Sequence, residues 1–413
     1  MVKMNRITAI TLELTEDCNL RCDYCFTYGK RKEKMTIETA KKSIDWLIEQ
    51  SKDQPRIDVT FWGGEPLTQL SLVKEIVEYI KIETSKANKG YALSMTTNGT
   101  LLSESTLKYL QDENILFSVS IDGREEVHNA HRPFASGKGS YKSVERGIKR
   151  ALKYFPELNL RLSLTSDKGY MLADDIKYFY SEWGVKNFNF SPVWEHDWTE
   201  DKLQIVEEQF KELSEFTIEE MEKGNELLIY PFRYGIERLL ATEKQLPCGA
   251  GRHYVGISTE GAIYPCHRFH KFSDTRKWNE QEFCIGHIDK GITRSDTRQM
   301  FYDYSIDNIE KCKKCEIYQY CVGHCYSSCL DIVGDMHEFN DAMCTWSKLV
   351  ITAAKFLILN LEENNTFKNI YMRHGNHINM SNRNGSCDCN AGCYENHGCK
   401  CYNACYQDVF DYQ

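Results

Sequence analysis

Short β-branched runs alternate with amphipathic helical stretches from residue 7 to about residue 195. In 36–52, Ile37, Ala40, Ile44, Leu47 and Ile48 form one apolar stripe at helical spacing. Such alternation predicts a parallel sheet covered by helices, and right-handed crossovers curl that sheet toward a barrel. We expect an α/β fold with a partial (β/α)6 TIM-type barrel, although the periodicity also fits an open doubly wound sheet. The predicted strands are 7–15, 57–62, 91–97, 116–121, 158–164 and 188–191.

The remainder of the chain changes character twice. Residues 203–244 are rich in Glu and in apolar residues at helical spacing, and predict a helical connector. Gly, Asp and Cys-containing loops then predict a second domain held by metal rather than by a large core, closed by a helix over 347–363. Polar residues 366–386 are typical of a loosely ordered linker before a Cys-rich tail. The predicted domains are 1–235, 236–364 and 365–413.

Composition excludes several classes of protein. With 413 residues, 41% of them hydrophobic and 27% charged, the bulk of the chain is globular. The formal charge of −9 argues against a nucleic-acid binder, whose affinity depends on phosphate neutralisation. No run of 18 apolar residues predicts a membrane span, and 349–361, interrupted by Lys355 and Asn360, is typical of a core helix. Because the N-terminus lacks a signal peptide, we expect a cytoplasmic protein.

Cysteine is unevenly distributed along this chain. Three of the 18 cysteines precede residue 26, and the other fifteen begin at Cys248. Since the cytosol keeps thiols reduced, tight spacings indicate metal ligands rather than disulfides. Cys18, Cys22 and Cys25 follow the first strand, where a barrel places its active site. Three thiolates leave one coordination position open. A zinc knuckle or buried free thiols are the structural alternatives.

The C-x3-C-x2-C set with an aromatic residue before its last Cys resembles the signature of radical S-adenosylmethionine (SAM) enzymes. A Gly-Gly-Glu-Pro run after the second strand, Thr-Asn-Gly after the third and Ser-Ile-Asp-Gly after the fourth resemble further motifs of that family. The resemblance implies a 4Fe-4S cluster on the three cysteines, with SAM on the open iron. It implies that Ser120 and Arg132 contact the ribose or carboxylate of SAM, with Arg146 as a rival to Arg132. The implied cofactor-binding residues are Tyr24, Gly63, Gly64, Glu65, Asn98, Ser120 and Arg132.

The second half of the chain resembles the SPASM domain, an extension of radical SAM enzymes that carries two auxiliary 4Fe-4S clusters. The resemblance rests on the spacing of Cys248, Gly261, Cys266, Cys312, Cys315, Cys321, Cys325 and Cys344. It implies an outer cluster on Cys312, Cys315, Cys321 and Cys344, and an inner cluster on Cys248, Cys266 and Cys325. The inner cluster then has three protein thiolates. His253, Cys284, Cys329 or a substrate thiolate would complete it. Two zinc sites are the alternative for these cysteines.

His267 and the tail are less specific signals. His267 stands where related sulfatase-maturating enzymes have an Asp base, so it is the catalytic candidate, and a hydrogen-bonded structural role is the alternative. The tail repeats C-x-C-x3-C-Y at Cys387, Cys389 and Cys393 and at Cys399, Cys401 and Cys405. An extra metal site, a stapled appendage and a segment resembling a Cys-rich substrate are the three interpretations.

Together these resemblances imply a radical SAM/SPASM peptide maturase. It would cleave SAM to a 5′-deoxyadenosyl radical and modify a ribosomally made, Cys-rich precursor peptide, forming a thioether crosslink. The implied cofactors are SAM and three 4Fe-4S clusters, and the implied electron donor is a flavodoxin or ferredoxin. We expect no nucleic-acid or membrane partner. The alternatives are a sulfatase-maturase-type oxidase that makes formylglycine and, outside enzymes, a multi-site zinc-binding protein.

Overall fold

A single mixed sheet organises the chain. The computed structural model describes residues 6–27, 32–243, 246–270 and 280–372. Strands β1 to β7 pair in parallel in chain order, which confirms the predicted parallel α/β fold. The strands are β1 (Ala9–Thr15), β2 (Arg56–Gly63), β3 (Gly90–Thr97), β4 (Ile115–Ser120), β5 (Asn159–Leu164), β6 (Asn187–Pro192), β7 (Leu228–Ile229), β8 (Tyr254–Ile257), β9 (Ala262–Tyr264), β10 (Gly286–His287) and β11 (Gly291–Ile292).

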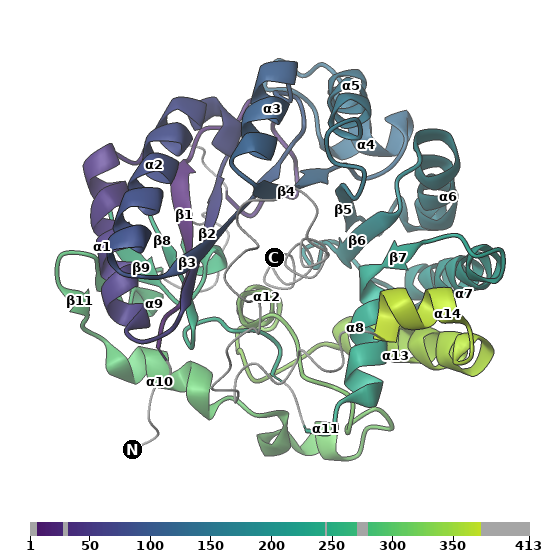
Figure 1. Cartoon of the computed structure of the whole chain (residues 1–413). Coiled ribbons are helices and arrows are strands. Elements are labelled where there is room, and N and C mark those ends of the chain that lie inside the picture. The colour runs from purple at the N-terminus through teal and green to yellow at the C-terminus, as the bar shows by residue number, and fades with distance from the viewer. Residues whose placement is uncertain (1–5, 28–31, 244–245, 271–279, 373–413) are drawn as a thin grey trace.

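The parallel strands follow an arc with helices on its outer side (Figure 1). In the described residues β7 and β11 form the two edges of the sheet, so the sheet is open. All six predicted strands are present, with ends within two residues of the expected ones. The helices are α1 (Ile37–Ser51), α2 (Leu70–Lys86), α3 (Glu104–Asp112), α4 (Glu125–His131), α5 (Tyr141–Ala151), α6 (Leu172–Trp183), α7 (Glu200–Glu222), α8 (Tyr230–Leu240), α9 (Glu280–Phe283), α10 (Ser295–Asp303), α11 (Glu310–Lys313), α12 (Tyr326–Ile332), α13 (Asp341–Leu361) and α14 (Asn365–Phe367).

Helix α1 shows how local sequence defines these elements. Thr36 caps its N-terminus, because the threonine hydroxyl accepts a hydrogen bond from the Thr39 backbone N at 3.1 Å. Its predicted stripe faces the sheet, with Ala40, Ile44 and Leu47 fully buried. Burying that stripe, rather than helix propensity alone, stabilises a helix of 15 residues.

The predicted helical connector over 203–244 is wrong in one respect, because it is not continuous. Helix α7 ends at Glu222, and Gly224 adopts a φ of +80°, a conformation that an L side chain rarely takes. The short strand β7 follows before Pro231 opens α8. The interruption adds a seventh parallel strand to the sheet.

The Cys-rich half is hydrogen-bonded into the same sheet. Strand β8 pairs with β1 in parallel, with Ala9 opposite Tyr254, and β9 to β11 continue the sheet as antiparallel strands. This half has a smaller hydrophobic cluster of its own, rich in aromatic residues such as Phe269, Phe301 and Tyr326. The first strand of the barrel region is therefore flanked by both halves of the chain.

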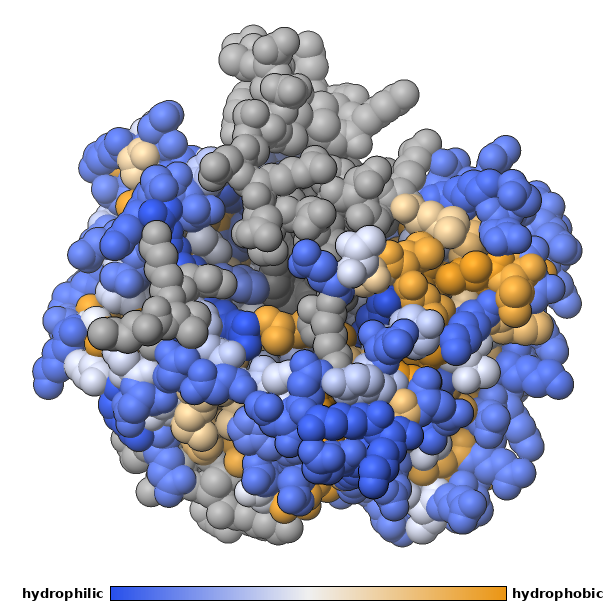
Figure 2. Space-filling model, turned by 90° about the horizontal axis from the view of Figure 1, so that it is seen from below, coloured by the Kyte–Doolittle hydropathy of each residue, from blue (hydrophilic) through white to orange (hydrophobic). Residues whose placement is uncertain are grey.

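Helix α13 is a core helix, as the sequence predicted. In the part of the chain that is described, it alone is long and apolar enough to cross a membrane, but it packs on α7 and α8. Trp346 lies 5.1 Å from Phe210 of α7, ring centre to ring centre. The surface in Figure 2 is mostly hydrophilic, with one apolar area to one side. On α13 itself, the exposed large apolar side chains are those of Phe356 and Leu359.

The first residues of the predicted linker, 366–372, are not loosely ordered as expected. Residues 365–372 are helical, and Phe367 and Tyr371 are fully buried. The Tyr371 hydroxyl accepts a hydrogen bond from the Ile229 backbone N at 2.9 Å, which ties this segment to β7. Aromatic burial overrides the polar composition there. The tail repeat, Cys387 to Cys405, lies outside the described residues.

Candidate active site

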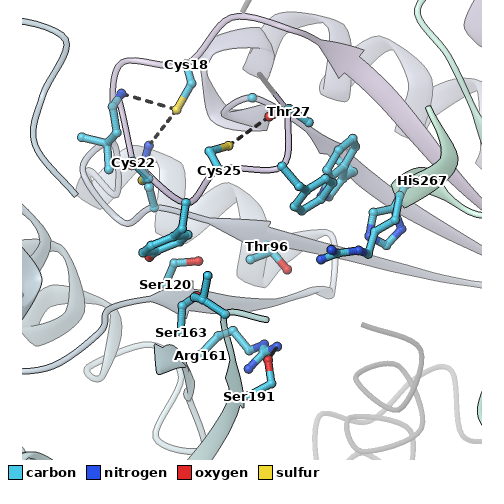
Figure 3. Close-up of a pocket in the computed structure, with 18 of the residues that line it drawn as sticks. Cys18, Cys22, Cys25, Thr27, Thr96, Ser120, Arg161, Ser163, Ser191 and His267 are labelled. Atoms are coloured by element: carbon cyan, nitrogen blue, oxygen red, sulfur yellow. Dashed lines mark hydrogen bonds between the residues drawn. The ribbon is translucent and has the colours of Figure 1, made fainter. Parts of the chain in front are cut away.

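The loop after β1 carries Cys18, Cys22 and Cys25, and all three line one pocket of about 460 Å³ at the carboxyl ends of the parallel strands (Figure 3). The Cys18 sulfur accepts a hydrogen bond from the Leu20 backbone N at 3.4 Å and one from Asn98 Nδ2 at 3.8 Å. The Cys25 sulfur lies 3.1 Å from the Thr27 hydroxyl. Polar donors therefore surround the sulfurs that line the pocket.

The Gly-Gly-Glu run lies directly against this loop. A Cβ at Gly63 would lie 2.2 Å from the Thr15 carbonyl oxygen, and one at Gly64 would lie 2.1 Å from that of Asp17. Gly64 N donates to Thr15 O at 2.7 Å, and the next backbone N donates to Asp17 O at 3.0 Å. Only glycine allows two backbone segments to approach so closely. The predicted motif thus contacts the cysteine loop through its backbone.

Glu65 is buried and joins the ends of two strands. Its carboxylate accepts hydrogen bonds from the Thr97 hydroxyl at 2.8 Å and the Asn98 backbone N at 2.7 Å. Asn98 in turn donates to Asn19 in the cysteine loop at 2.7 Å. The predicted residues Glu65 and Asn98 therefore hold the ends of β2 and β3 against that loop.

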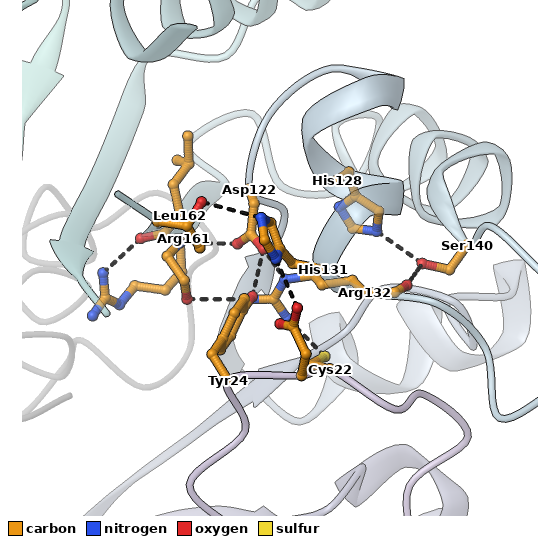
Figure 4. A network of polar contacts seen from close by, with 12 residues as sticks. Cys22, Tyr24, Asp122, His128, His131, Arg132, Ser140, Arg161 and Leu162 are labelled. Atoms are coloured by element: carbon orange, nitrogen blue, oxygen red, sulfur yellow. Dashed lines mark hydrogen bonds and ion pairs between the residues drawn. The ribbon is translucent and has the colours of Figure 1, made fainter. Parts of the chain in front are cut away.

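A buried ion pair supports the other side of the loop (Figure 4). Arg132 Nε donates to Asp122 at 2.8 Å, and the Tyr24 hydroxyl donates to the same carboxylate. Arg132 also reaches Ser163 at 3.3 Å and the Cys22 sulfur at 4.0 Å. Although burial alone would raise it, the Arg132 guanidinium holds the pKa of Asp122 below its usual value.

The pocket brings together the cofactor residues that the sequence predicted. Ser120 lies at its wall, and Arg132 lines it, whereas the rival Arg146 is exposed on α5. The geometry favours Arg132 over Arg146 as a contact of anything bound there. The predicted residues that line the pocket are Cys18, Cys22, Tyr24, Cys25, Gly63, Gly64, Glu65, Asn98, Ser120, Arg132, His267 and Cys325.

His267 also lines the pocket, with its ring 6.1 Å from that of Phe26, the residue after Cys25. The Thr11 hydroxyl donates to the Tyr254 hydroxyl at 3.0 Å, and that hydroxyl lies 2.5 Å from His267 Nδ1. The imidazole packs 4.8 Å from the Trp62 ring. Burial, with the neighbouring Arg268 second, lowers the pKa of His267 to about 3, so the ring is neutral near pH 7. The contacts with Tyr254 and Trp62 support the hydrogen-bonded structural role of His267, and the residue still lines the pocket.

Electrostatic interactions link several of the later cysteines to one another. Burial, followed by the charges of Cys325 and Cys248, raises the pKa of Cys266. Burial, followed by Cys321, Cys344 and Cys315, raises the pKa of Cys312 to about 11. Such mutual effects require these thiols to be neighbours.

Three further residues stood as candidates for the open inner position. Cys329 is fully buried in α12, and the charges of Cys325 and Cys344 act on it, so it lies near members of both predicted sets. Cys284 donates to the Gly286 carbonyl at 3.4 Å, and the His253 backbone carbonyl accepts from Thr8 N at 2.9 Å. No three His, Cys, Asp or Glu side chains of the described part are close enough to hold a single metal ion.

Sequence reasoning missed several pocket residues. Trp62 precedes the glycine pair, and Arg268 follows His267; its guanidinium lies 4.4 Å from the Phe26 ring centre and pairs with Glu195 at 3.4 Å. Arg161 lies within a predicted strand. Its position two residues before Ser163 places both side chains on one face of β5, a signal that the alternation of the strand contains.

Comparison with known proteins agrees with this geometry. The Radical SAM superfamily model matches residues 12–165, which span β1 to β5 and hence the cysteine loop. Residues 12–165 form a radical SAM domain. A cysteine-type anaerobic sulfatase-maturating enzyme of Clostridium perfringens is 27% identical over 336 residues, covering 75% of this chain and 85% of the relative.

Two further similarities extend beyond the radical SAM domain. The antilisterial bacteriocin subtilosin biosynthesis protein AlbA of Bacillus subtilis is 26% identical over 353 residues, covering 82% of this chain and 70% of AlbA. The solved structure of native anSMEcpe with bound AdoMet superposes with a TM-score of 0.72 at 23% identity, covering 86% of this chain and 99% of that one. The fold is thus shared over most of both chains.

The residues of the radical SAM domain fit an iron-sulfur cluster. Thiolates bind such clusters, and hydrogen bonds to their sulfurs stabilise the charge of the cluster. Cys18 receives two such bonds, and Arg132 brings a positive charge to within 4.0 Å of the Cys22 sulfur. Cys18, Cys22 and Cys25 all line the pocket, and together they would supply three of the four protein ligands that such a cluster can take.

Proposed function

We propose that the chain is a radical SAM/SPASM maturase of a ribosomally synthesised, Cys-rich peptide, and that it forms a thioether crosslink. The observation that carries the proposal is the pocket, which is lined by the three-cysteine loop and also by His267 and Cys325. A peptide bound in this pocket would contact both the SAM site and the predicted inner cluster. The names of AlbA and of the sulfatase-maturating relatives support a peptide or protein substrate.

In this proposal Cys18, Cys22 and Cys25 hold the SAM-binding 4Fe-4S cluster, which with SAM supplies hydrogen-atom abstraction when bound. Gly63 and Gly64 keep the β2 end close to the cysteine loop, so their backbone groups face the methionyl end of SAM. The buried Asp122 and Arg132 pair fixes the position of Tyr24 beside the cluster loop. The aromatic side chains of Phe26 and Trp62 exclude water from the wall between loop and His267.

The two auxiliary clusters are proposed on the two cysteine groups. The outer one would use Cys312, Cys315, Cys321 and Cys344, and the inner one Cys248, Cys266 and Cys325. Since Cys325 is exposed and lines the pocket, the inner cluster would lie within reach of a bound peptide. A flavodoxin or ferredoxin in the cytoplasm is the proposed electron donor.

A sulfatase-maturase-type oxidase is the second candidate, because a sulfatase-maturating enzyme is among the most similar relatives. The two reactions differ in the mass of the product. A thioether removes two hydrogens from the peptide, whereas formylglycine formation from Cys removes two hydrogens and also replaces sulfur with oxygen. Mass spectrometry of a Cys-rich peptide encoded beside the gene, and of a sulfatase-derived Cys peptide, separates them.

The first test is reductive SAM cleavage by the reconstituted protein. We expect Cys18→Ala, Cys22→Ala and Cys25→Ala to abolish 5′-deoxyadenosine formation, because each removes a ligand of the SAM-binding cluster. Cys284→Ser is the matched control, since this thiol donates to the Gly286 carbonyl and is a candidate ligand of the inner cluster only, not of the SAM-binding cluster. Unchanged 5′-deoxyadenosine production in the three alanine variants would refute the proposal.

A further inference from the structure

The interior of the barrel region is lined by hydroxyl groups. Parallel barrels usually fill this space with layers of branched apolar side chains. Here each of the first six strands contributes a hydroxyl to the pocket wall. These residues are Thr11, Thr60, Thr96, Ser120, Ser163 and Ser191. Five of these hydroxyls already bond protein groups. Since a hydroxyl has one donor and two acceptor sites, such a wall can still bond a polar ligand.

Arg161 of β5 lies among these hydroxyls. Its Nη2 donates to the Ser191 hydroxyl at 2.5 Å, and its Nη1 donates to the Leu162 carbonyl at 3.1 Å. In the sheet Arg161 is opposite Ser120 of β4, and Ser163 is opposite Ser191 of β6. Figure 3 shows Thr96, Ser120 and Ser163 between the cysteine loop and the Arg161 guanidinium.

Arg161 differs from the other two arginines that line the pocket, because each of those forms an ion pair with a carboxylate. Arg132 pairs with Asp122 at 2.8 Å, and Arg268 pairs with Glu195 at 3.4 Å. Within the described ranges, Arg161 has no carboxylate within 4.0 Å. Burial lowers the pKa of Arg161, yet an arginine stays charged. A partly buried guanidinium with unused donors is stabilised when a carboxylate binds it.

We propose that Arg161 and Ser191 form a carboxylate-binding subsite at the inner end of the pocket. The planar guanidinium offers two parallel N–H donors to a carboxylate, and Ser191 holds its orientation. The ligand is an acidic group of the peptide, because Thr96, Ser120 and Ser163 lie between Arg161 and the cysteine loop, where the methionyl end of SAM is proposed to bind. The methionyl carboxylate of SAM is the other source of the same chemistry, and the test distinguishes the two. The inference rests on the proposed function, since it identifies a recognition element for its cofactor or its substrate.

Equilibrium binding to the cluster-loaded protein tests the subsite and separates the two sources. In the first arm, SAM and decarboxylated SAM are compared, since they differ in the carboxylate alone. If the subsite holds the SAM carboxylate, R161Q weakens SAM binding at least about tenfold and leaves decarboxylated SAM within about twofold, as expected for loss of a charge-assisted hydrogen-bonded pair.

In the second arm, two fluorescent Cys-containing hexapeptides are compared that differ in one Asp or Asn. If the subsite holds a substrate carboxylate, R161Q removes an Asp preference of about tenfold that the unmodified protein shows. R161K, which keeps the charge without the planar fork, should retain part of the preference in the arm that responds. R146Q on α5 is the control, because that arginine is exposed.

A response in either arm supports the subsite and names its ligand. Wild-type affinities and preferences in both arms for R161Q, at wild-type iron content and circular dichroism, would overturn it. If R161Q does not fold, the R161K variant is measured instead. An unchanged carboxylate preference of R161K in both arms would also overturn the subsite. Binding is measured without turnover, so a protein that binds through Arg161 and cleaves no SAM would refute the proposed function alone.

Discussion

Asp122 is the residue on which the polar network beside the cysteine loop depends. Its carboxylate accepts from Arg132 at 2.8 Å, from the Ser163 backbone N at 2.9 Å and from the Tyr24 hydroxyl. The side chains of Asp122 and Arg132 are both nearly inaccessible. A pair of this kind costs desolvation to form, but removing one member leaves the other charge buried and uncompensated.

We therefore expect Asp122→Asn to lower the free energy of unfolding by about 3–5 kcal/mol, because Arg132 loses its counter-charge. Urea unfolding at equal cluster loading, followed by circular dichroism, measures the change. Asp174→Asn is the control. Asp174 is mostly exposed and lies 3.8 Å from Arg124, so its loss should change stability by at most about 0.5 kcal/mol. Equal stability of the two variants would contradict the role given to Asp122.

At the scale of elements, the contact between the end of β2 and the cysteine loop decides the geometry of the site. Gly64 lies against the backbone carbonyl of Asp17, and backbone atoms cannot move aside as a flexible side chain can. The position of the loop, and hence of its three thiols, follows from that contact.

Gly64→Ala should lower 5′-deoxyadenosine formation about 100-fold, because a displacement of about 1 Å is enough to misplace reacting groups. Gly90→Ala is the matched control, since a Cβ at Gly90 would lie 3.8 Å from its nearest neighbour, the Pro55 carbonyl oxygen. Single-turnover assays at equal iron content measure both variants. Activity of the Gly64→Ala protein within a few fold of the control would show that the loop adapts to the added methyl.

At the scale of the whole molecule, the two hydrophobic clusters are joined by one sheet and by α13. Strand β8 extends the sheet beside β1, and Trp346 of α13 packs on Phe210. Several later cysteines belong to the second cluster: Cys266, Cys312 and Cys329 are buried in it, and Cys284, Cys321 and Cys344 pack against it. Loss of the first iron-sulfur cluster should therefore leave that part of the molecule folded.

The ligand sets predict about 12 iron atoms per chain in the reconstituted protein, from three 4Fe-4S clusters. The triple variant Cys18→Ala, Cys22→Ala, Cys25→Ala should retain about 8 of them, because four of the seven proposed auxiliary thiols, Cys266, Cys312, Cys321 and Cys344, lie in or against the second hydrophobic cluster. Iron and sulfide analysis, with electron paramagnetic resonance of the reduced protein, measures the count. Zinc in place of iron, or loss of all iron in the triple variant, would contradict the assignment of the ligands.

Local sequence predicted the elements well and their interruptions less well. The six strands and α1 follow from side-chain alternation and helical periodicity, which are local properties. The break between α7 and α8 was missed, since Gly224 is one glycine in a long amphipathic stretch. The packed segment 365–372 was missed because its two buried aromatic residues, Phe367 and Tyr371, stand among polar neighbours.

The sequence by itself determined the radical SAM domain, because cysteine spacing on a short loop is a local chemical pattern. The two later sets of cysteines stay predictions from the same kind of pattern. Only the tertiary structure decided that Arg132 rather than Arg146 lines the pocket, and that Arg161 lies among hydroxyls from neighbouring strands. It also decided that Tyr254 pairs beside Ala9 and brings His267 to the pocket. Such contacts join segments far apart in the chain, and hydrogen bonding and burial between them leave no periodic signal in either segment.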